Sequence, residues 1–87
     1  MHMTQGYLNS QLNITTQTLV KAGPGKLVTV VVSTGGTVTI NDAASVGAAG
    51  AANQIASLGA GSYQLIFPFF NGLVVQSTTA ASSVAFE

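Results

Sequence analysis

Few side chains in this sequence can carry out acid–base or nucleophilic chemistry. The chain has one histidine and no cysteine, and its charged residues are Lys21, Lys26, Asp42 and Glu87. General acid–base catalysis requires titratable groups that are positioned around a substrate. Asp42 follows a predicted strand and is typical of a turn residue that accepts local backbone N–H bonds. We therefore predict no catalytic residues and no enzymatic activity.

The sequence also lacks a pattern that binds a metal ion or a cofactor. His2 lies in the opening Met-His-Met, which is typical of a cloning junction, so we interpret residues 1–2 as a remnant of cloning. Without cysteines the chain can form neither a disulfide nor a Cys/His zinc site. Asn41 and Asp42 offer too few oxygen ligands for calcium. The AGPGK segment (22–26) lacks the spacer and the Ser/Thr of a phosphate-binding loop. We predict no metal site and no cofactor.

Neutral residues dominate the composition. Charged residues make up 5% of the chain and its formal net charge is zero, whereas an average soluble domain has about 25% charged residues. Two lysines cannot form the basic patch that nucleic acids require. The first residues lack the basic and apolar regions of a signal peptide, and no apolar run reaches the ~20 residues of a membrane-spanning helix. The composition favours a protein that works in contact with other protein, with no nucleic-acid or membrane partner.

Apolar residues recur with a period of two along most of the chain, which predicts β-strands. We predict an all-β fold, a small antiparallel β-sandwich or jelly-roll-like barrel of about seven short strands. The expected strands are 12–20, 27–33, 37–41, 53–58, 62–69, 72–77 and 83–87. The expected core consists of Val28, Val30, Val32, Val38, Ile40, Leu65 and Phe67. We expect strand 27–33, which is apolar on both faces, to be central and covered twice.

Three segments carry strong turn signals, namely 21–26 (KAGPGK), 34–36 (TGG) and the Asn71-Gly72 pair. We expect each of them to close a hairpin between two paired strands. We assign residues 12–87 to a single β-sandwich domain and residues 1–11 to a flexible N-terminal segment.

The Ala- and Gly-rich segment 42–61 permits two interpretations. One is a helix that Ser45 caps and Gly59 ends. The other is a flexible loop that leads into the strand 53–58. Gly47 and Gly50 favour the loop, because each costs about 1 kcal/mol relative to alanine in a helix.

Residues 65–75 (LIFPFFNGLVV) are apolar except for Asn71-Gly72. A two-residue hairpin at that pair would place apolar side chains on both faces of its tip, and a small sandwich covers one face. Either a bulge at Pro68 rotates the phenylalanines into the core, or other copies of the chain cover the second face. The low charge favours the second interpretation. The predicted self-association residues are Phe69, Phe70, Leu73 and Val74.

The order of the segments AGPGKLVTVVVST, TINDAAS, ANQIA, FPFFNGLVV and SVAFE resembles that of small structural proteins of tailed bacteriophages and prophages. The resemblance covers residues 18–87 and consists of turns and strands rather than a catalytic signature. It implies a self-associating β-sandwich that decorates or stabilises a capsid or forms part of a head or tail fibre. It further implies a homo-oligomer, with a trimer favoured, and another virion protein such as the capsid or a fibre as partner. The implied location is the virion, after assembly in the cytoplasm of the bacterial host.

A receptor- or carbohydrate-binding β-sandwich module is the alternative function. Such a module exposes aromatic and polar groups in a concave site. The aromatic residues of this chain are four Phe and two Tyr, with no Trp. Tyr63 shares a predicted face with Leu65 and Phe67, which favours its burial. These features favour assembly over sugar binding.

Overall fold

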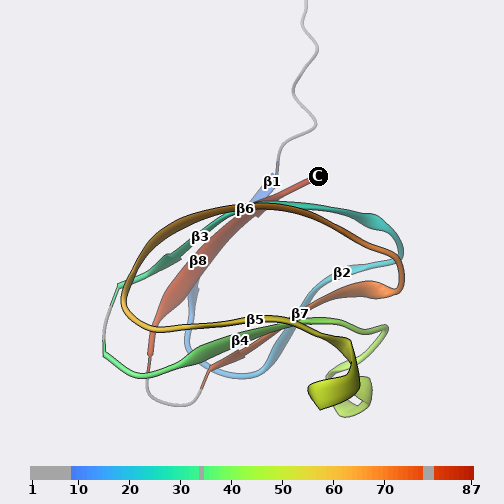
Figure 1. Ribbon diagram of the computed structural model, residues 1–87, viewed down its shortest axis with the longest axis horizontal. Coiled ribbons are helices and arrows are strands. Elements are labelled where there is room, and N and C mark those ends of the chain that lie inside the picture. Colours follow the sequence, from blue (N-terminus) through green and yellow to red (C-terminus); the bar gives the residue numbers. More distant parts are fainter. Residues whose placement is uncertain (1–8, 34, 78–79) are drawn as a thin grey trace, which may run out of the picture.

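Strands make up most of the molecule (Figure 1). The computed structural model describes residues 9–33, 35–77 and 80–87, so His2 and the rest of residues 1–8 lie outside the described residues. The described strands are β1 (Asn9–Ile14), β2 (Thr18–Ala22), β3 (Gly25–Val32), β4 (Val38–Asp42), β5 (Gln54–Leu58), β6 (Gly61–Phe69), β7 (Gly72–Ser77) and β8 (Ser82–Phe86). The predicted all-β fold is confirmed.

The strands form two four-stranded antiparallel sheets that face each other across the core (Figure 1). Sheet A has the order β1-β8-β3-β6, and sheet B has the order β2-β7-β4-β5. β1 pairs with β8, β2 with β7, β3 with β6 and β4 with β5. The first four strands therefore pair, in antiparallel order, with the last four strands. The paired strands form one long two-stranded ribbon, and this ribbon is rolled up so that its strands form two sheets. This is the topology of a jelly roll.

The three predicted hairpins are wrong, because each turn carries the chain from one sheet to the other. Segment 21–26 joins β2 in sheet B to β3 in sheet A. Residue 34 of the segment 34–36 lies outside the described residues, and the strands before and after this segment, β3 and β4, belong to sheet A and sheet B. Asn71-Gly72 joins β6 in sheet A to β7 in sheet B. Neither residue of this pair has the positive φ that a type I′ hairpin turn requires. A short turn signal specifies that the chain reverses, whereas the sheet order decides which strands pair.

The core lies between the sheets and is mostly aliphatic. Its buried members are Ile14, Leu27, Val30, Val32, Val38, Ile40, Phe69, Leu73, Val75, Ala80, Val84 and Phe86. Of the residues predicted to form the core, Leu65 is half-buried against this cluster and Phe67 is 50% exposed. Val28 is also half-buried. The register of β3 shifts between Leu27 and Thr29, so Leu27 takes the inward position that alternation assigned to Val28.

The segment predicted as one strand, 12–20, is divided between β1 in sheet A and β2 in sheet B. Asn13 interrupts the alternation, because its φ of 56° lies in the left-handed region, which asparagine tolerates better than most residues. The register with β8 shifts at this point. As a result Ile14 is buried whereas Leu12 is 71% exposed, although the pattern placed both on one face.

The first strand starts earlier than the predicted domain boundary. β1 begins at Asn9, which pairs with Phe86 of β8. Residues 9–11 of the segment expected to be flexible are therefore part of sheet A.

Two short 3₁₀ turns occupy the connection between β4 and β5. They are η1 (Val46–Ala48) and η2 (Ala51–Asn53), and β5 follows directly. The predicted cap residue Ser45 accepts a hydrogen bond at Oγ from the N–H of Ala48, with an N···O distance of 3.3 Å. The interpretation as a loop followed by a strand is confirmed, and the α-helix is not formed.

Candidate functional site

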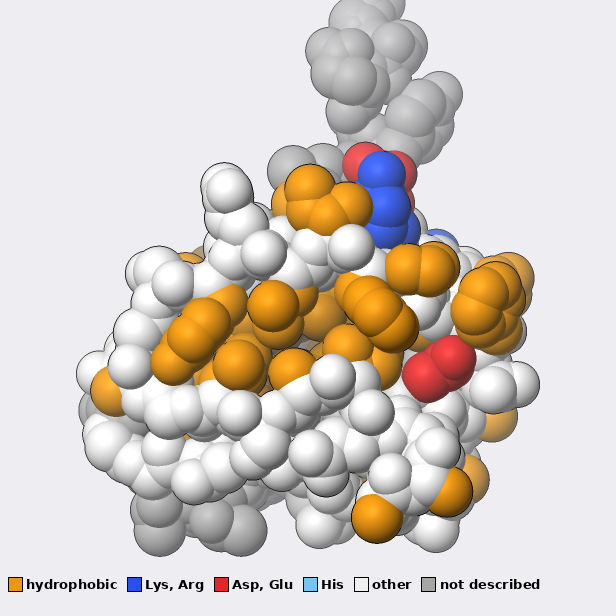
Figure 2. Space-filling model, in the orientation of Figure 1, with side chains coloured by type: hydrophobic (Ala, Val, Ile, Leu, Met, Phe, Trp, Pro, Cys, Tyr) orange, Lys and Arg blue, Asp and Glu red, His pale blue; other side chains and the backbone are white. Residues whose placement is uncertain are grey.

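The charged side chains lie toward one end of the sandwich (Figure 2). Lys21 and Asp42 both lie opposite Leu73, on the two strands that flank β7. Lys26 Nζ lies 3.7 Å from Oε1 of Glu87, and both side chains are about half exposed. An exposed ion pair of this kind stabilises a fold by at most about 1 kcal/mol. Among the described residues, no group of three His, Cys, Asp or Glu side chains is placed to hold a metal ion.

Asp42 uses its carboxylate to hold the turn between β6 and β7. Oδ2 accepts a hydrogen bond from the N–H of Phe70 at 2.9 Å, and Oδ1 accepts from the N–H groups of Asn71 at 2.7 Å and Gly72 at 3.3 Å. Desolvation raises the pKa of Asp42, but the hydrogen bonds from these three N–H groups outweigh it and hold the pKa below its ordinary value. Asp42 therefore accepts backbone N–H bonds as predicted, although its partners are distant in the sequence rather than local.

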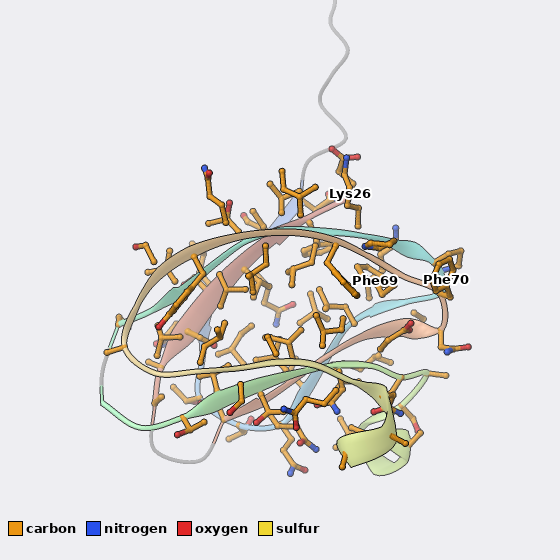
Figure 3. All side chains as sticks on the ribbon, in the orientation of Figure 1. Lys26, Phe69 and Phe70 are labelled. Atoms are coloured by element: carbon orange, nitrogen blue, oxygen red, sulfur yellow. The ribbon has the colours of Figure 1, made fainter. Side chains whose placement is uncertain are left out.

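The four residues predicted to form the self-association surface are separated by the fold. Phe69, Leu73 and Val74 are 1%, 0% and 0% exposed. They are covered within a single chain and cannot be the exposed patch that was predicted. Phe70 is 71% exposed. In Figure 3 Phe69 points into the space between the sheets, whereas Phe70 lies at the outer end of the turn.

The connection between β4 and β5 explains how Val74 is buried. The neighbours of Val74 in β7 point into the core, so Val74 lies on the outer face of sheet B, beside Asn41 of β4. Asn41 is 1% exposed. Its Nδ2 donates to the carbonyl of Gly50 at 2.9 Å and to Oδ1 of Asn53 at 3.0 Å. These bonds hold the η1–η2 connection over this part of sheet B, so the chain itself covers both faces of β7.

Large apolar side chains remain exposed on the edge strand β6 and on the turn after it. Ile66, Phe67 and Phe70 are 69%, 50% and 71% exposed, and we call these three residues the β6 strip. β5 has five residues and β6 has nine. Because a short connection joins them, β5 can face only the first part of β6.

Half-buried side chains extend this surface between the two edge strands. Tyr63 and Leu65 of β6 and Ile55 and Leu58 of β5 pack against the core without being fully covered. The hydroxyl of Tyr63 donates to the carbonyl of Gly59 at 3.0 Å. Figure 2 shows hydrophobic side chains gathered across the middle of this face, between β6 and β5. Alternation alone missed this surface.

Pro68 removes a backbone donor from the free edge of β6. Among the described strands, β6 is the last in sheet A and pairs with β3 alone. Lys26, which lies opposite Pro68 in β3, exchanges both of its backbone hydrogen bonds with Glu87. The backbone groups of Lys26 and Pro68 therefore point away from each other. The ring nitrogen of Pro68 faces the free edge, where it cannot donate to an incoming strand.

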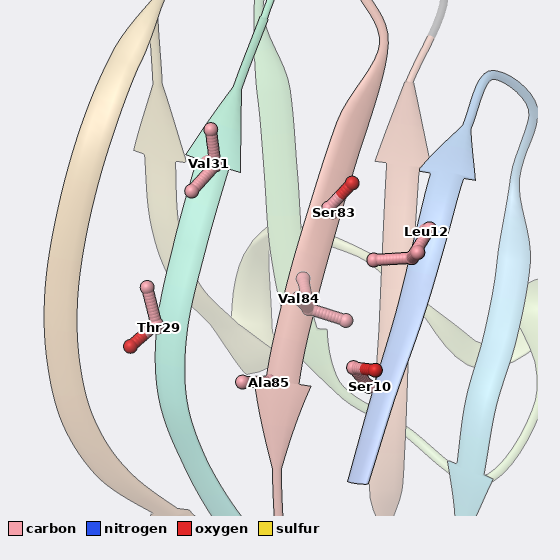
Figure 4. A pocket seen from close by; sticks show the side chains of 7 residues that line it. All are labelled: Ser10, Leu12, Thr29, Val31, Ser83, Val84 and Ala85. Carbon is pink, nitrogen blue, oxygen red and sulfur yellow. The ribbon is translucent and has the colours of Figure 1, made fainter.

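A furrow of about 190 Å³ runs along the outer face of sheet A (Figure 4). The small outward residues Ser83 and Ala85 of β8 form its floor, and larger residues of β1 and β3 line its sides, including Leu12 and Val31. No charged side chain lines it. Val31 is 37% exposed, so β3 is covered on one face rather than on both as predicted.

Comparisons with protein-family models, with curated proteins and with solved structures find no match for this chain. Within the described residues, no helix is long and apolar enough to cross a membrane. The functional argument therefore rests on the β6 strip and the furrow, two uncharged surfaces that can bind other apolar groups.

Proposed function

We propose that this chain is a structural subunit of a virus particle, which decorates or stabilises a capsid or forms part of a head or tail fibre and self-assembles through an apolar surface. The observation that carries this proposal is the β6 strip, where three large apolar side chains are exposed within five consecutive residues at one edge of sheet A. The chain that bears it has four charged residues. Contiguous apolar patches on a folded domain mark interaction sites, and few charges oppose close contact between copies.

The virion setting is supported by the topology and by the resemblance. Jelly rolls occur in viral capsid proteins and also in lectins and cupins, and one fold serves many functions. The resemblance of residues 18–87 to structural proteins of tailed bacteriophages selects the virion among these. On this proposal the chain forms a homo-oligomer, a trimer by that resemblance, and contacts another virion protein such as the capsid or a fibre. It assembles in the cytoplasm of the bacterial host.

The alternative function, a receptor- or carbohydrate-binding module, would depend on the furrow on sheet A as its binding site. Sugar sites combine aromatic faces with polar groups. The furrow is lined by Ser, Thr, Val, Leu and Ala side chains and contains no aromatic residue. This lining favours assembly over carbohydrate binding.

The proposal is tested on particles released from a bacterium that carries the coding sequence. Purified particles should contain the chain in stoichiometric amounts by mass spectrometry, and an antibody against it should label them in electron micrographs. Particles from a strain with the coding sequence deleted serve as the control. Particles that lack the chain in the undeleted strain would contradict the proposal.

A further inference from the structure

We propose that copies of this chain meet at the free edge of β6, where the β6 strip of one copy packs against β6 of a second copy. This inference rests on the proposed self-assembly and names the surface and the partner. It replaces the predicted surface, because Phe69, Leu73 and Val74 are buried within one chain.

The exposed apolar area of the strip supplies the larger part of what a contact between copies needs. A fully covered phenylalanine buries about 150–250 Å². With exposures of 69%, 50% and 71% for Ile66, Phe67 and Phe70, the strip presents about 350 Å² of apolar surface. Two strips in contact would bury about 700 Å² in total, against the ~1,000 Å² that a specific interface exceeds. The half-buried side chains between β6 and β5 lie beside the strip and would supply the remainder.

The distribution of charge selects a second copy as the occupant. No charged residue occurs between Asp42 and Glu87, so β5, β6 and β7 are neutral throughout. The nearest carboxylate, that of Asp42, is already bonded to the turn that carries Phe70. An identical strip brings no unpaired charge to the contact, whereas a charged partner would have to desolvate its charges without compensation.

Pro68 determines the mode of contact. Its ring nitrogen faces the free edge, so this half of β6 cannot extend sheet A by a regular ladder of backbone hydrogen bonds. Contact is therefore made by side chains, and the assembly closes around an axis rather than growing by addition of strands.

Two charge substitutions at equally exposed positions test the surface. Phe70 and Leu12 are each 71% exposed, and Leu12 lies in the furrow on sheet A. We compare wild type, Phe70→Lys and Leu12→Lys by sedimentation equilibrium at equal concentrations, with circular dichroism to verify folding. Wild type should sediment as a multiple of 8.7 kDa. Phe70→Lys should raise the dissociation constant at least about tenfold, and Leu12→Lys should leave it unchanged.

The possible outcomes separate this inference from the proposed function. If Leu12→Lys dissociates the oligomer and Phe70→Lys does not, the furrow is the contact and the inference fails, while self-assembly stands. If both variants or neither variant dissociate it, the β6 strip is not the specific contact and the inference fails. A monomeric wild type overturns both self-assembly and the inference, whereas the particle experiment decides the virion setting by itself. Ile66→Lys, at a position 69% exposed, replaces Phe70→Lys if that variant does not fold.

Pro68→Ala tests the mode of contact. The variant restores an N–H group that faces the free edge, so strands of successive copies can pair. Sedimentation velocity should then show species larger than the wild-type oligomer. An unchanged size distribution would show that Pro68 does not limit assembly and would overturn this part of the inference.

Discussion

β6 and β7 follow each other in the chain and are both rich in apolar residues, yet their surroundings are opposite. β7 is buried at five of its six residues, whereas β6 is buried at one of its nine. β7 lies inside sheet B between β2 and β4, and β6 forms an edge of sheet A. The η1–η2 connection also covers the outer face of sheet B near Val74 of β7. Position in the sheet and cover from a loop decide burial here, and apolar content does not.

A buried charge in β7 should give the largest effect. Val75 is 0% exposed and lies in the core, so the carboxylate of Val75→Asp would be buried without a partner, which costs several kcal/mol. We expect this variant not to fold by circular dichroism and thermal unfolding. Ile66→Asp in β6 is the control and should fold. Cooperative unfolding of Val75→Asp near the wild-type temperature would contradict the assignment of β7 to the core.

Two adjacent phenylalanines allow the comparison between β6 and β7 to be tested at the point where one strand ends and the other begins. Phe69→Ala should lower the free energy of unfolding by about 3–5 kcal/mol, because it leaves a cavity between the sheets. Phe70→Ala should change it by less than about 0.5 kcal/mol. Urea denaturation measures both values at a protein concentration where the chains are dissociated. Equal losses for the two variants would show that Phe70 is also packed within one chain.

The first residue of β7 tests how closely the chain approaches its neighbours at this end of sheet B. A Cβ atom on Gly72 would clash with the carbonyl oxygen of Ala43 and would lie 2.9 Å from that of Lys21. Gly72→Ala should therefore lower the free energy of unfolding by about 1–3 kcal/mol, since backbone must move. Gly59, where an added Cβ meets nothing within 4 Å, provides the matched control. A Gly72→Ala variant as stable as Gly59→Ala would rule out the close approach.

The carboxylate that holds the turn between the two strands should give the smallest effect. Because the folded-state pKa of Asp42 lies below its ordinary value, its stabilisation is complete above the unfolded value, near pH 3.9, and is lost as the pH falls through the folded-state pKa. Asp42→Asn should lower stability by about 1 kcal/mol at neutral pH and reduce the loss of stability in acid. The measurement is urea denaturation between pH 7 and pH 2.5. Parallel pH profiles for variant and wild type would contradict this role of Asp42.

The period of two in the sequence was sufficient to predict the fold class and part of the core. Val30, Val38 and Ile40 are buried as alternation predicts. The pairing of the strands was not predictable from the sequence. Asn71-Gly72 signals a reversal of the chain, which suggested that the two strands beside it pair with each other, whereas β6 pairs with β3. The register of β1 was also not predictable from the sequence, since the left-handed φ of Asn13 moves Leu12 to the exposed face.

Of the four residues predicted to form the self-association surface, three are buried within one chain. Phe70 is exposed as expected, but the sequence pattern contains no sign that the η1–η2 connection covers Val74. That cover depends on the amide of Asn41 and its bonds to Gly50 and Asn53, which no hydrophobic period reveals. Phe67 was assigned to the core by alternation and is 50% exposed on the edge strand β6.

The rolled ribbon sets the order in which the chain can fold. Among the described strands, β4 and β5 are the one consecutive pair that is bonded directly, so they close the shortest loop and we expect them to meet first. The pairs β3–β6, β2–β7 and β1–β8 can then form outward in turn, each bringing together segments farther apart in the sequence. β8 lies between β1 and β3 in sheet A, so that sheet remains divided until the end of the domain has been synthesised. Folding dominated by such distant pairings is slow, on the order of milliseconds to seconds. If copies self-assemble as proposed, the edge of β6 is exposed throughout that interval, before a second copy covers it.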